Sequence, residues 1–308
     1  MGFAAPGGMM SRSPREMPPL PPASPSPGPL DLLISLLSDE SPTVQGAVRG
    51  RLQRLGKEAL PGLLRGSRSQ DPLVRARCRE LVLERGRERA ARRLVRYALH
   101  ARHDLDTALL LLDDFVDPGH DPRPTLRAIH AMGQEVARRL RRRGQTPAQV
   151  LSEYLYKERG FSGMDSVEPA PGHASLARAV ETRTAMPLVL CALWRRVAAT
   201  AGLRCELLPV PGHVVLLVRQ PDGDQLVDPF GDGELIEREH VLGYLSAHNL
   251  PFQEEWLKPA PTTSMFLRHT LNTAACFRAI GRRGEVRRLA RVVRLLAGHP
   301  EVPTQPLG

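Results

Sequence analysis

The sequence has few aromatic residues, few cysteines and no long hydrophobic run. Aromatic side chains make up 4% of its 308 residues, so the core must consist mainly of Leu, Val and Ala, a composition that favours helices. Because no run of about 18 apolar residues occurs, we expect no membrane-spanning helix and no membrane partner. The four cysteines are far apart and form no CxxC pair, which argues against a disulfide framework and a zinc site. Unpaired thiols are typical of a reducing compartment, so we predict a cytoplasmic location.

Histidines and carboxylates are concentrated between His100 and Asp121, but their spacing matches no metal-binding pair on a helix. Pro118 and Pro122 indicate a loop in this segment. We therefore interpret Asp113 and its neighbours as surface residues of a turn, and the sequence predicts neither a metal ion nor another cofactor.

The formal net charge is +10, and only three of the 43 basic residues are lysines. Such a ratio indicates the codon usage of a GC-rich genome, and we expect a bacterial source. The densest basic cluster consists of Arg138, Arg139, Arg141, Arg142 and Arg143. No aromatic side chains alternate with these arginines to stack on bases, so an acidic protein partner is favoured over nucleic acid. The sequence leaves the oligomeric state open.

An internal repeat with an offset of thirty residues runs from Leu30 to about Glu84. Pro42 matches Pro72, and apolar residues match on both sides of the prolines: Leu33 with Leu63, Val44 with Val74, Val48 with Cys78, and Leu52 with Val82. Each unit predicts a short helix, a turn and a second helix, with Asp71 as an N-cap before the second proline. The pattern resembles HEAT repeats with a shortened period, and it predicts either a stabilising cap or a concave partner-binding face.

Three helices followed by three strands are predicted between Leu151 and Asp228. The helices are expected at 151–160, 175–183 and 188–201, and the strands at 204–210, 213–219 and 225–228. The third helix, opened by Pro187, is apolar on all sides in its first half, which predicts a central buried helix. His213 is the first residue of the second predicted strand and Asp228 is the last residue of the third. Catalytic and binding side chains are often located at such strand ends.

Four motifs give this region a resemblance to a known family. They are Ser152-Glu-Tyr-Leu-Tyr-Lys-Glu-Arg-Gly-Phe161, Arg183-Thr-Ala-Met-Pro187, Pro211-Gly-His213 and Val227-Asp-Pro-Phe230. In order and spacing they resemble the SirB-type branch of the transglutaminase-like proteins over about residues 95–255. The resemblance implies a papain-like α+β core, with helical repeats at both ends.

Active transglutaminase-like enzymes have a nucleophilic Cys at the start of the central helix, a His general base and an Asp that orients the His. The resemblance implies corresponding positions in this chain. His213 and Asp228 match the last two positions. In the active enzymes the Cys lies fifteen residues before the Gly that ends its helix. Gly202 ends the helix here, so the resemblance places the nucleophile position on Pro187, and proline at this position is general in the SirB-type branch. Cys191 lies one turn further along, and its apolar neighbours predict a buried, inert thiol. Cys205 and Cys276 are interpreted as packing residues.

Two helices, at 262–280 and 285–296, are predicted at the C-terminus and resemble a tetratricopeptide-like hairpin. The predicted organisation is therefore a disordered Pro/Gly/Ser-rich tail at 1–29, HEAT-like repeats at 30–90, the transglutaminase-like domain at 91–255 and the hairpin at 256–308.

The leading hypothesis is a non-catalytic scaffold or regulatory protein-interaction module, because the nucleophile position holds Pro187. The first alternative is an amide hydrolase or acyltransferase that uses His213 and Asp228, with Cys191 as the candidate thiol. The second is binding of nucleic acid by the arginine cluster at 138–143.

Overall fold

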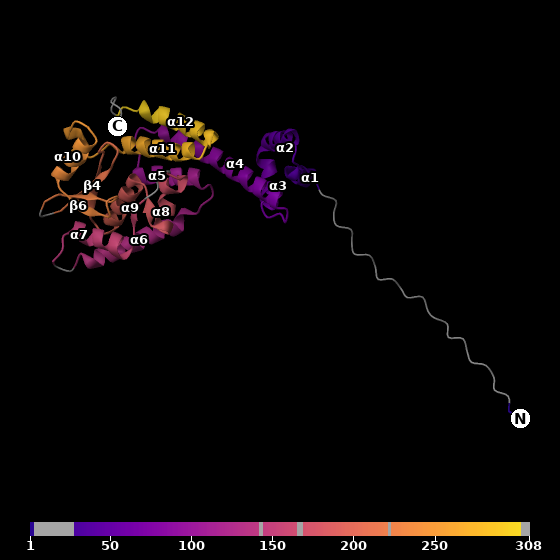
Figure 1. Ribbon diagram of the computed structural model, residues 1–308, viewed down its shortest axis with the longest axis horizontal. Coiled ribbons are helices and arrows are strands. Elements are labelled where there is room, and N and C mark those ends of the chain that lie inside the picture. Colours follow the sequence, from indigo (N-terminus) through magenta and orange to yellow (C-terminus); the bar gives the residue numbers. More distant parts are fainter. Residues whose placement is uncertain (3–27, 142–143, 165–168, 221–222, 303–308) are drawn as a thin grey trace. The chain divides into compact units, whose positions relative to one another are not determined.

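The computed structural model describes residues 1–2, 28–141, 144–164, 169–220 and 223–302 (Figure 1). Most of the tail predicted at 1–29 lies outside this described part. The chain divides into two units, Met1–Arg79 and Glu80–Gly308.

The first unit consists of helices that repeat as the sequence predicts. Its elements are α1 (Pro29–Ser35), a 3-10 turn (Leu36–Ser38), α2 (Pro42–Leu55), a second 3-10 turn (Gly56–Ala59), α3 (Leu60–Gly66) and the beginning of α4 (Pro72–Ala98). The Asp71 carboxylate accepts a hydrogen bond from the backbone N–H of Leu73 at 2.8 Å, which confirms the predicted N-cap. Val48, Leu52 and the repeat partner Cys78 are buried, so the two helix pairs share an apolar interior.

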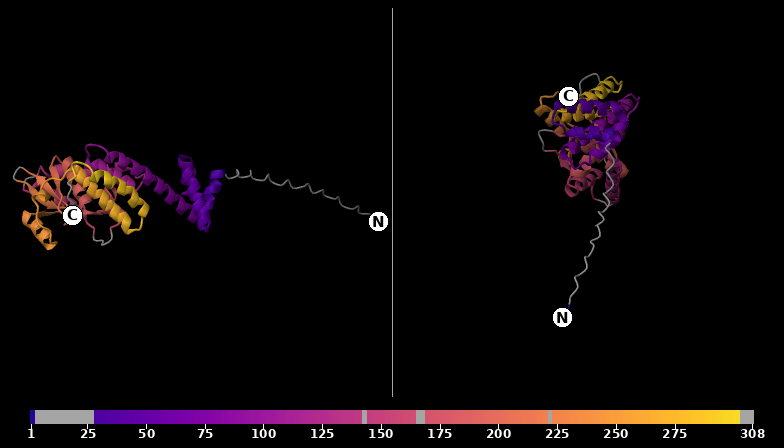
Figure 2. Two further views of the ribbon diagram at one scale, coloured as in Figure 1. Left: turned by 90° about the horizontal axis from the view of Figure 1, so that it is seen from above. Right: turned by 90° about the vertical axis from the view of Figure 1, so that its right-hand side faces the viewer.

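Helices of the second unit that are far apart in the sequence share one hydrophobic cluster. This cluster joins the rest of α4 to α5 (Leu105–Val116), α11 (Thr262–Ala279) and α12 (Arg283–Ala297). The two predicted C-terminal helices are thus present, and they lie side by side in yellow in Figures 1 and 2. Phe115 of α5 meets Phe277 of α11 edge to face, with ring centroids 5.5 Å apart.

The main core surrounds α9 (Pro187–Thr200), whose residues Leu188 to Trp194 are all buried, as their apolar character predicts. Helices α6 (Pro122–Arg139) and α8 (Leu176–Thr182) contact it on one side, and strands β3 (Arg204–Leu208) and β4 (Val215–Arg219) contact it on the other.

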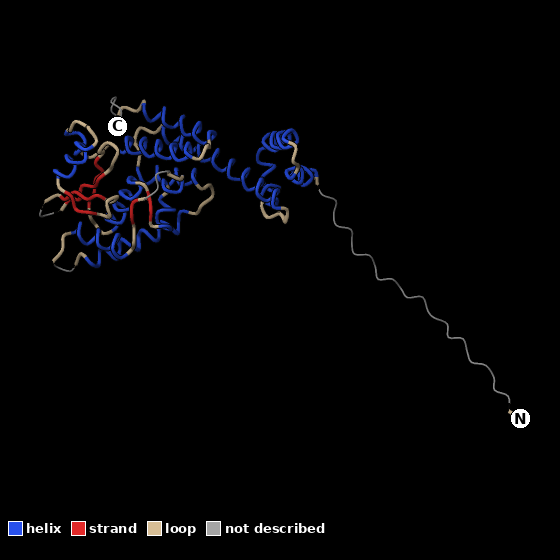
Figure 3. Tube along the Cα trace, in the orientation of Figure 1, coloured by secondary structure: helices blue, strands red, loops and turns tan. Residues whose placement is uncertain are grey.

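The sheet is antiparallel, with the order β3-β4-β5-β6, and its strands are confined to one part of the unit (Figure 3). Strands β4 and β5 (Gln225–Asp228) form the predicted hairpin. Strand β6 (Glu234–Ile236) was not predicted, because three residues are too few to show a period-two pattern. The second strand begins at Val215, so His213 lies in the preceding turn and does not open the strand.

The remaining elements are short and fill the spaces around this core. They are α7 (Pro147–Ser152), a π-helical turn (Glu153–Glu158), the parallel pair β1 (Ser162–Gly163) and β2 (Thr184–Ala185), 3-10 turns at Pro171–Ala174 and Glu254–Leu257, and α10 (Arg238–Ala247). The helix predicted at 151–160 is therefore α7 followed by a π-helical turn, and it ends at Gly160, whose φ is +69°.

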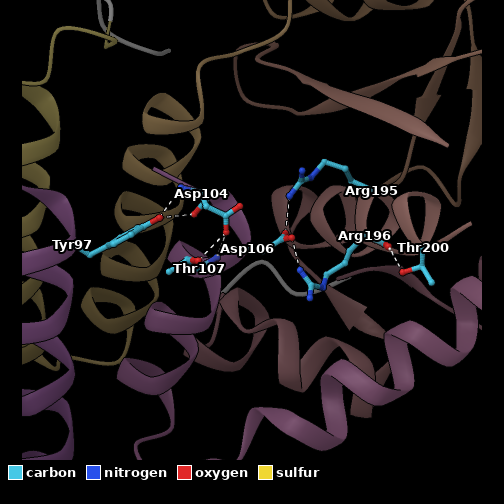
Figure 4. Close-up of polar contacts among 7 residues, drawn as sticks. All are labelled: Tyr97, Asp104, Asp106, Thr107, Arg195, Arg196 and Thr200. Carbon is cyan, nitrogen blue, oxygen red and sulfur yellow. Dashed lines mark hydrogen bonds and ion pairs between the residues drawn. The ribbon is translucent and has the colours of Figure 1, made fainter. Parts of the chain in front are cut away.

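Polar contacts fix α9 against the N-terminal end of α5 (Figure 4). Asp104 caps α5 by accepting a hydrogen bond from the Thr107 N–H at 2.8 Å. Two residues further, the Asp106 carboxylate binds the guanidinium groups of Arg195, at 2.6 Å, and Arg196. Two consecutive arginines on one carboxylate restrict sliding of α9 along α5.

The prediction for Asp113 is wrong. It belongs to α5 and is buried, whereas the sequence pattern indicated a surface turn. Its two carboxylate oxygens accept hydrogen bonds from the backbone N–H groups of Leu176 and Ala177, at 2.9 and 3.0 Å, and so cap α8. Burial raises the pKa of Asp113 to about 6, against the opposing effect of these donors. Pro118 lies in a real loop, which begins only after Val116, whereas Pro122 is the first residue of α6.

Candidate functional site

The edge of the sheet brings together two of the side chains singled out by the sequence. His213 lies in the turn before β4, and Asp228 is the last residue of the neighbouring antiparallel strand β5. His213 Nε2 donates a hydrogen bond to Asp228 Oδ1 at 2.8 Å. The two side chains are 14% and 23% exposed, so the pair is largely shielded from water.

The environment of Asp228 favours its ionised form. Burial acts to raise the pKa of this carboxyl, but hydrogen bonds from His213 and from the backbone amides of Gly231 and Phe230 outweigh burial and lower the pKa below its ordinary value. The Phe230 amide lies 2.9 Å from Asp228 Oδ1. The charged Asp228 carboxylate therefore accepts hydrogen bonds both from the His213 side chain and from backbone amides of the loop that follows Asp228.

Two aromatic rings hold the His213 imidazole in place. The ring of Phe230 meets it edge to face with centroids 5.9 Å apart, and the ring of Tyr244, from α10, lies 5.7 Å away. The preceding Gly212 has φ +72°, and a Cβ at this position would lie 2.7 Å from the Tyr244 hydroxyl oxygen. Only glycine fits this turn, which explains the Pro-Gly-His motif physically.

The loop after Asp228 is fastened by the first of the four motifs. Tyr156 donates a buried hydrogen bond to the carbonyl of Pro229 at 2.7 Å, and Ser152 donates one to the carbonyl of Gly233 at 2.6 Å. Motifs about seventy residues apart in the sequence therefore form one structural unit. The short helix and π-helical turn position the loop that carries the carboxylate.

Pro187 is the first residue of α9, as predicted, and it is half-buried. The backbone N–H of the preceding Met186 donates to the carbonyl of His173 at 3.0 Å, which ties the start of the helix to a neighbouring 3-10 turn. Proline suits the first helical position because no N–H partner is needed there. Its side chain offers no nucleophile.

Cys191, one turn further along α9, is fully buried. Its thiol donates a weak hydrogen bond to the carbonyl of Val214, with Sγ and O 3.2 Å apart. Burial, reinforced by the charge of Asp228, raises the pKa of Cys191 well above its ordinary value. Cys205 and Cys276 also have raised pKa values, of about 12 and about 11, because of burial. A thiolate, the form that attacks an acyl carbon, is thus disfavoured at all three positions.

Arg268 was not singled out from the sequence, although it reaches this site. It projects from α11, and its Nη1 donates to the carbonyl of Val210 at 3.0 Å, next to the turn that carries His213. Burial lowers its pKa, while Cys191 and Tyr244 act in the opposite direction. No local pattern could reveal this role, because α11 lies more than fifty residues after the turn.

Two arginines of the predicted basic cluster are paired with carboxylates. Arg139 pairs with Glu135 at 2.8 Å and with Glu158, and Arg138 also pairs with Glu135. Arg142 and Arg143 lie outside the described residues. Within the described ranges, no three His, Cys, Asp or Glu residues are grouped closely enough to hold a metal ion. No helix of those ranges is long and apolar enough to cross a membrane.

Comparisons with known proteins identify one domain of the chain. Residues 123–271 match the transglutaminase-like superfamily, so the chain carries a transglutaminase-like domain that includes Arg268 of α11, beyond the predicted boundary at 255. The chain is 25% identical over 159 residues to proteins described as "UPF0162 protein" from two strains of Xylella fastidiosa, 9a5c and Temecula1. The match covers 49% of this chain and 57% of each bacterial relative. No solved structure matches the chain.

Proposed function

We propose that this chain is a non-catalytic transglutaminase-like protein of the SirB type, which acts by binding a partner protein. The observation that carries the proposal is the start of α9, where Pro187 occupies the position that the resemblance assigns to the nucleophile. Acyl transfer by this class of site requires a thiolate beside the histidine.

Cys191 does not replace the missing thiol. Its sulfur is buried in the core and engaged with the Val214 carbonyl, and its pKa is raised. An acyl substrate would have to enter the packed centre of the domain to reach it. The His213–Asp228 pair then serves to hold the turn before β4 against the loop after β5.

The flanking helices support a role in binding. The first unit contains pairs of short helices that resemble HEAT-like repeats, and α11 and α12 resemble a tetratricopeptide-like hairpin. Repeats of these kinds commonly present extended protein-binding surfaces. The formal charge of +10 favours an acidic partner.

Turnover assays on the full-length protein test the proposal. A glutamine-containing peptide is incubated with a primary amine, and hydrolysis and amine incorporation are followed by mass spectrometry. We expect no product above the level given by the variants His213→Ala and Cys191→Ser. Cys276→Ser, which alters a buried thiol of α11, is the matched control.

The alternative is an amide hydrolase or acyltransferase, and one observation favours it: the His213–Asp228 hydrogen bond is intact and Asp228 favours its charged form. Such a pair could orient a histidine that activates water. Product formation that disappears in His213→Ala and persists in Cys276→Ser would establish this alternative and refute the non-catalytic proposal.

A further inference from the structure

A groove in the second unit lies away from the His213 site, between α4 and α12. Its volume is about 910 Å³. The α4 wall runs from Glu84 to Arg96, and the α12 wall from Gly284 to Arg291. At 1.5 Å per residue, the α4 wall is about 18 Å long, which matches about three turns of a peptide helix.

Ion pairs between the two helices hold the walls together. Arg87 pairs with the buried Glu285 at 3.2 Å, and Arg282 pairs with Glu80 at 3.4 Å. The Arg87 and Glu285 side chains are only 17% and 10% exposed, so this contact is largely shielded from solvent. The two walls of the groove are therefore fixed to each other by ion pairs, one of which is largely buried.

The lining is strongly basic. Six arginines face the groove: Arg89, Arg92, Arg96, Arg287, Arg288 and Arg291. Arg92 pairs with Glu88 at 2.6 Å and Arg288 with Glu84 at 3.6 Å. Among the described residues, the other four make no ion pair, and all four are exposed. Guanidinium groups bind carboxylates in bidentate geometry, so an acidic ligand would meet unused donors on both walls.

The floor of the groove is apolar. Ala91 is buried and Val95 is half-buried, and both continue into the hydrophobic cluster shared by α4, α5, α11 and α12. An apolar strip between two basic rows complements a helix with an apolar stripe flanked by carboxylates.

Other occupants fit less well. Among the residues that the structure describes, no aromatic side chain lines the groove, whereas single-stranded nucleic acid is held by stacking on aromatic rings. The chain's own residues 3–27 contain two arginines and a single glutamate, so they lack the required charge.

We propose that the α4–α12 groove binds an acidic amphipathic helix of a partner protein. This inference rests on the proposed function in one respect, namely that the protein acts by binding. It adds the location of the binding surface and the chemistry of the partner.

The test uses full-length protein and a fluorescein-labelled peptide of about 16 residues, with leucines at i, i+4, i+7 and i+11 and glutamates elsewhere. Fluorescence anisotropy gives the dissociation constant at about 0.15 M salt, where distant charges are screened. The variant Arg96→Glu/Arg291→Glu reverses one charge on each wall. The control Arg127→Glu/Arg278→Glu makes the same change in net charge at exposed positions of α6 and α11, outside the groove.

We expect saturable binding that the groove variant weakens at least about tenfold and the control variant less than about threefold. Thermal unfolding of both variants should match that of the parent, because the altered side chains are exposed. A peptide with the same composition but scattered leucines should bind more weakly.

Three results would overturn the inference: no saturable binding, equal weakening by both variants, or tighter binding of a 20-nucleotide single strand that the groove variant abolishes. The turnover assay with the glutamine-containing peptide and a primary amine separates this inference from the proposed function. Cleavage or amine coupling that requires His213 would refute the non-catalytic proposal, whereas absent binding refutes only the groove.

Discussion

If the His213–Asp228 pair is retained for structure, removing either partner should destabilise the fold. The proposed change is His213→Ala or Asp228→Ala in the full-length chain. A working catalytic pair often behaves in the opposite way, because polar groups held for chemistry are placed at some cost in stability. The sign of the stability change therefore distinguishes the two roles.

The magnitude follows from the contacts of each side chain. Asp228→Ala removes the acceptor of the His213 hydrogen bond and of the Phe230 amide, at 2.8 and 2.9 Å. Hydrogen bonds to charged groups contribute about 1.5–3 kcal/mol each, and the partial exposure of this pair favours the lower end, so we expect a loss of about 3–4 kcal/mol for the two bonds. His213→Ala removes one such bond and two ring contacts, for about 2–3 kcal/mol. The double variant should reveal a coupling energy of about 1–2 kcal/mol.

The pair also predicts a pH dependence. Because the folded-state pKa of Asp228 lies below its ordinary value of 3.8, the unfolded chain binds this proton more readily in acid. The stability contributed by Asp228 is therefore complete above the ordinary pKa and declines as the pH falls through the folded pKa. In the variant Asp228→Asn, which keeps one acceptor oxygen, the free energy of unfolding should decline less as the pH falls in this acidic range.

Urea unfolding followed by far-UV circular dichroism measures these free energies. Glu181→Ala is the matched control, because it breaks the Arg178–Glu181 ion pair, whose side chains are 51% and 48% exposed, and it should cost less than about 0.5 kcal/mol. Unchanged or increased stability of both His213→Ala and Asp228→Ala would refute the structural role.

Two further predictions concern glycine and histidine in the same domain. Gly233→Ala should cost more than about 2 kcal/mol in urea unfolding, because Gly233 has φ +72° and the new Cβ would lie 2.3 Å from the Tyr156 ring. Gly243→Ala, inside α10 with nothing within 4 Å, should instead raise stability by up to about 1 kcal/mol, and equal losses would contradict this reasoning. His269 is fully buried, and burial lowers its pKa from 6.5 to about 4, against the opposing effect of a hydrogen bond with the backbone of Ala174. The unfolded chain therefore binds more protons between these values, so stability should fall by up to about 3 kcal/mol as the pH drops through that window. His269→Leu should remove this slope in pH-dependent thermal unfolding, and an identical slope would refute the assignment.

Much of the domain could be predicted because its signals are local. The all-round apolar character of residues 188–194 predicted the buried helix α9, and turn residues between alternating segments predicted the β4–β5 hairpin. The resemblance to transglutaminase-like proteins, rather than the strand pattern, implied that Asp228 orients His213, and the two side chains are hydrogen-bonded. The position of Pro187 at the start of α9 followed from the helix boundary.

What the sequence could not reveal depends on contacts between distant segments. Asp113 appeared to belong to a surface turn, because its role is to cap α8, more than sixty residues later. Arg268 reaches the His213 turn from α11, and the basic groove forms only where α4 meets α12. The charge pattern along the sequence shows where the arginines are. It does not show that α4 and α12 lie next to each other and so bring their arginines to one groove.

The most direct test of the central claim is the reactivity of Cys191 in the native full-length protein. Site-resolved mass spectrometry after iodoacetamide treatment at neutral pH gives the labelling rate, with the same protein in urea as the reference. We expect Cys191 to stay unlabelled until the chain unfolds, because its thiol is buried and its pKa is raised. Rapid native labelling of Cys191 that slows in His213→Ala would show a thiolate activated by the histidine, and would contradict the claim that this site lacks a nucleophile.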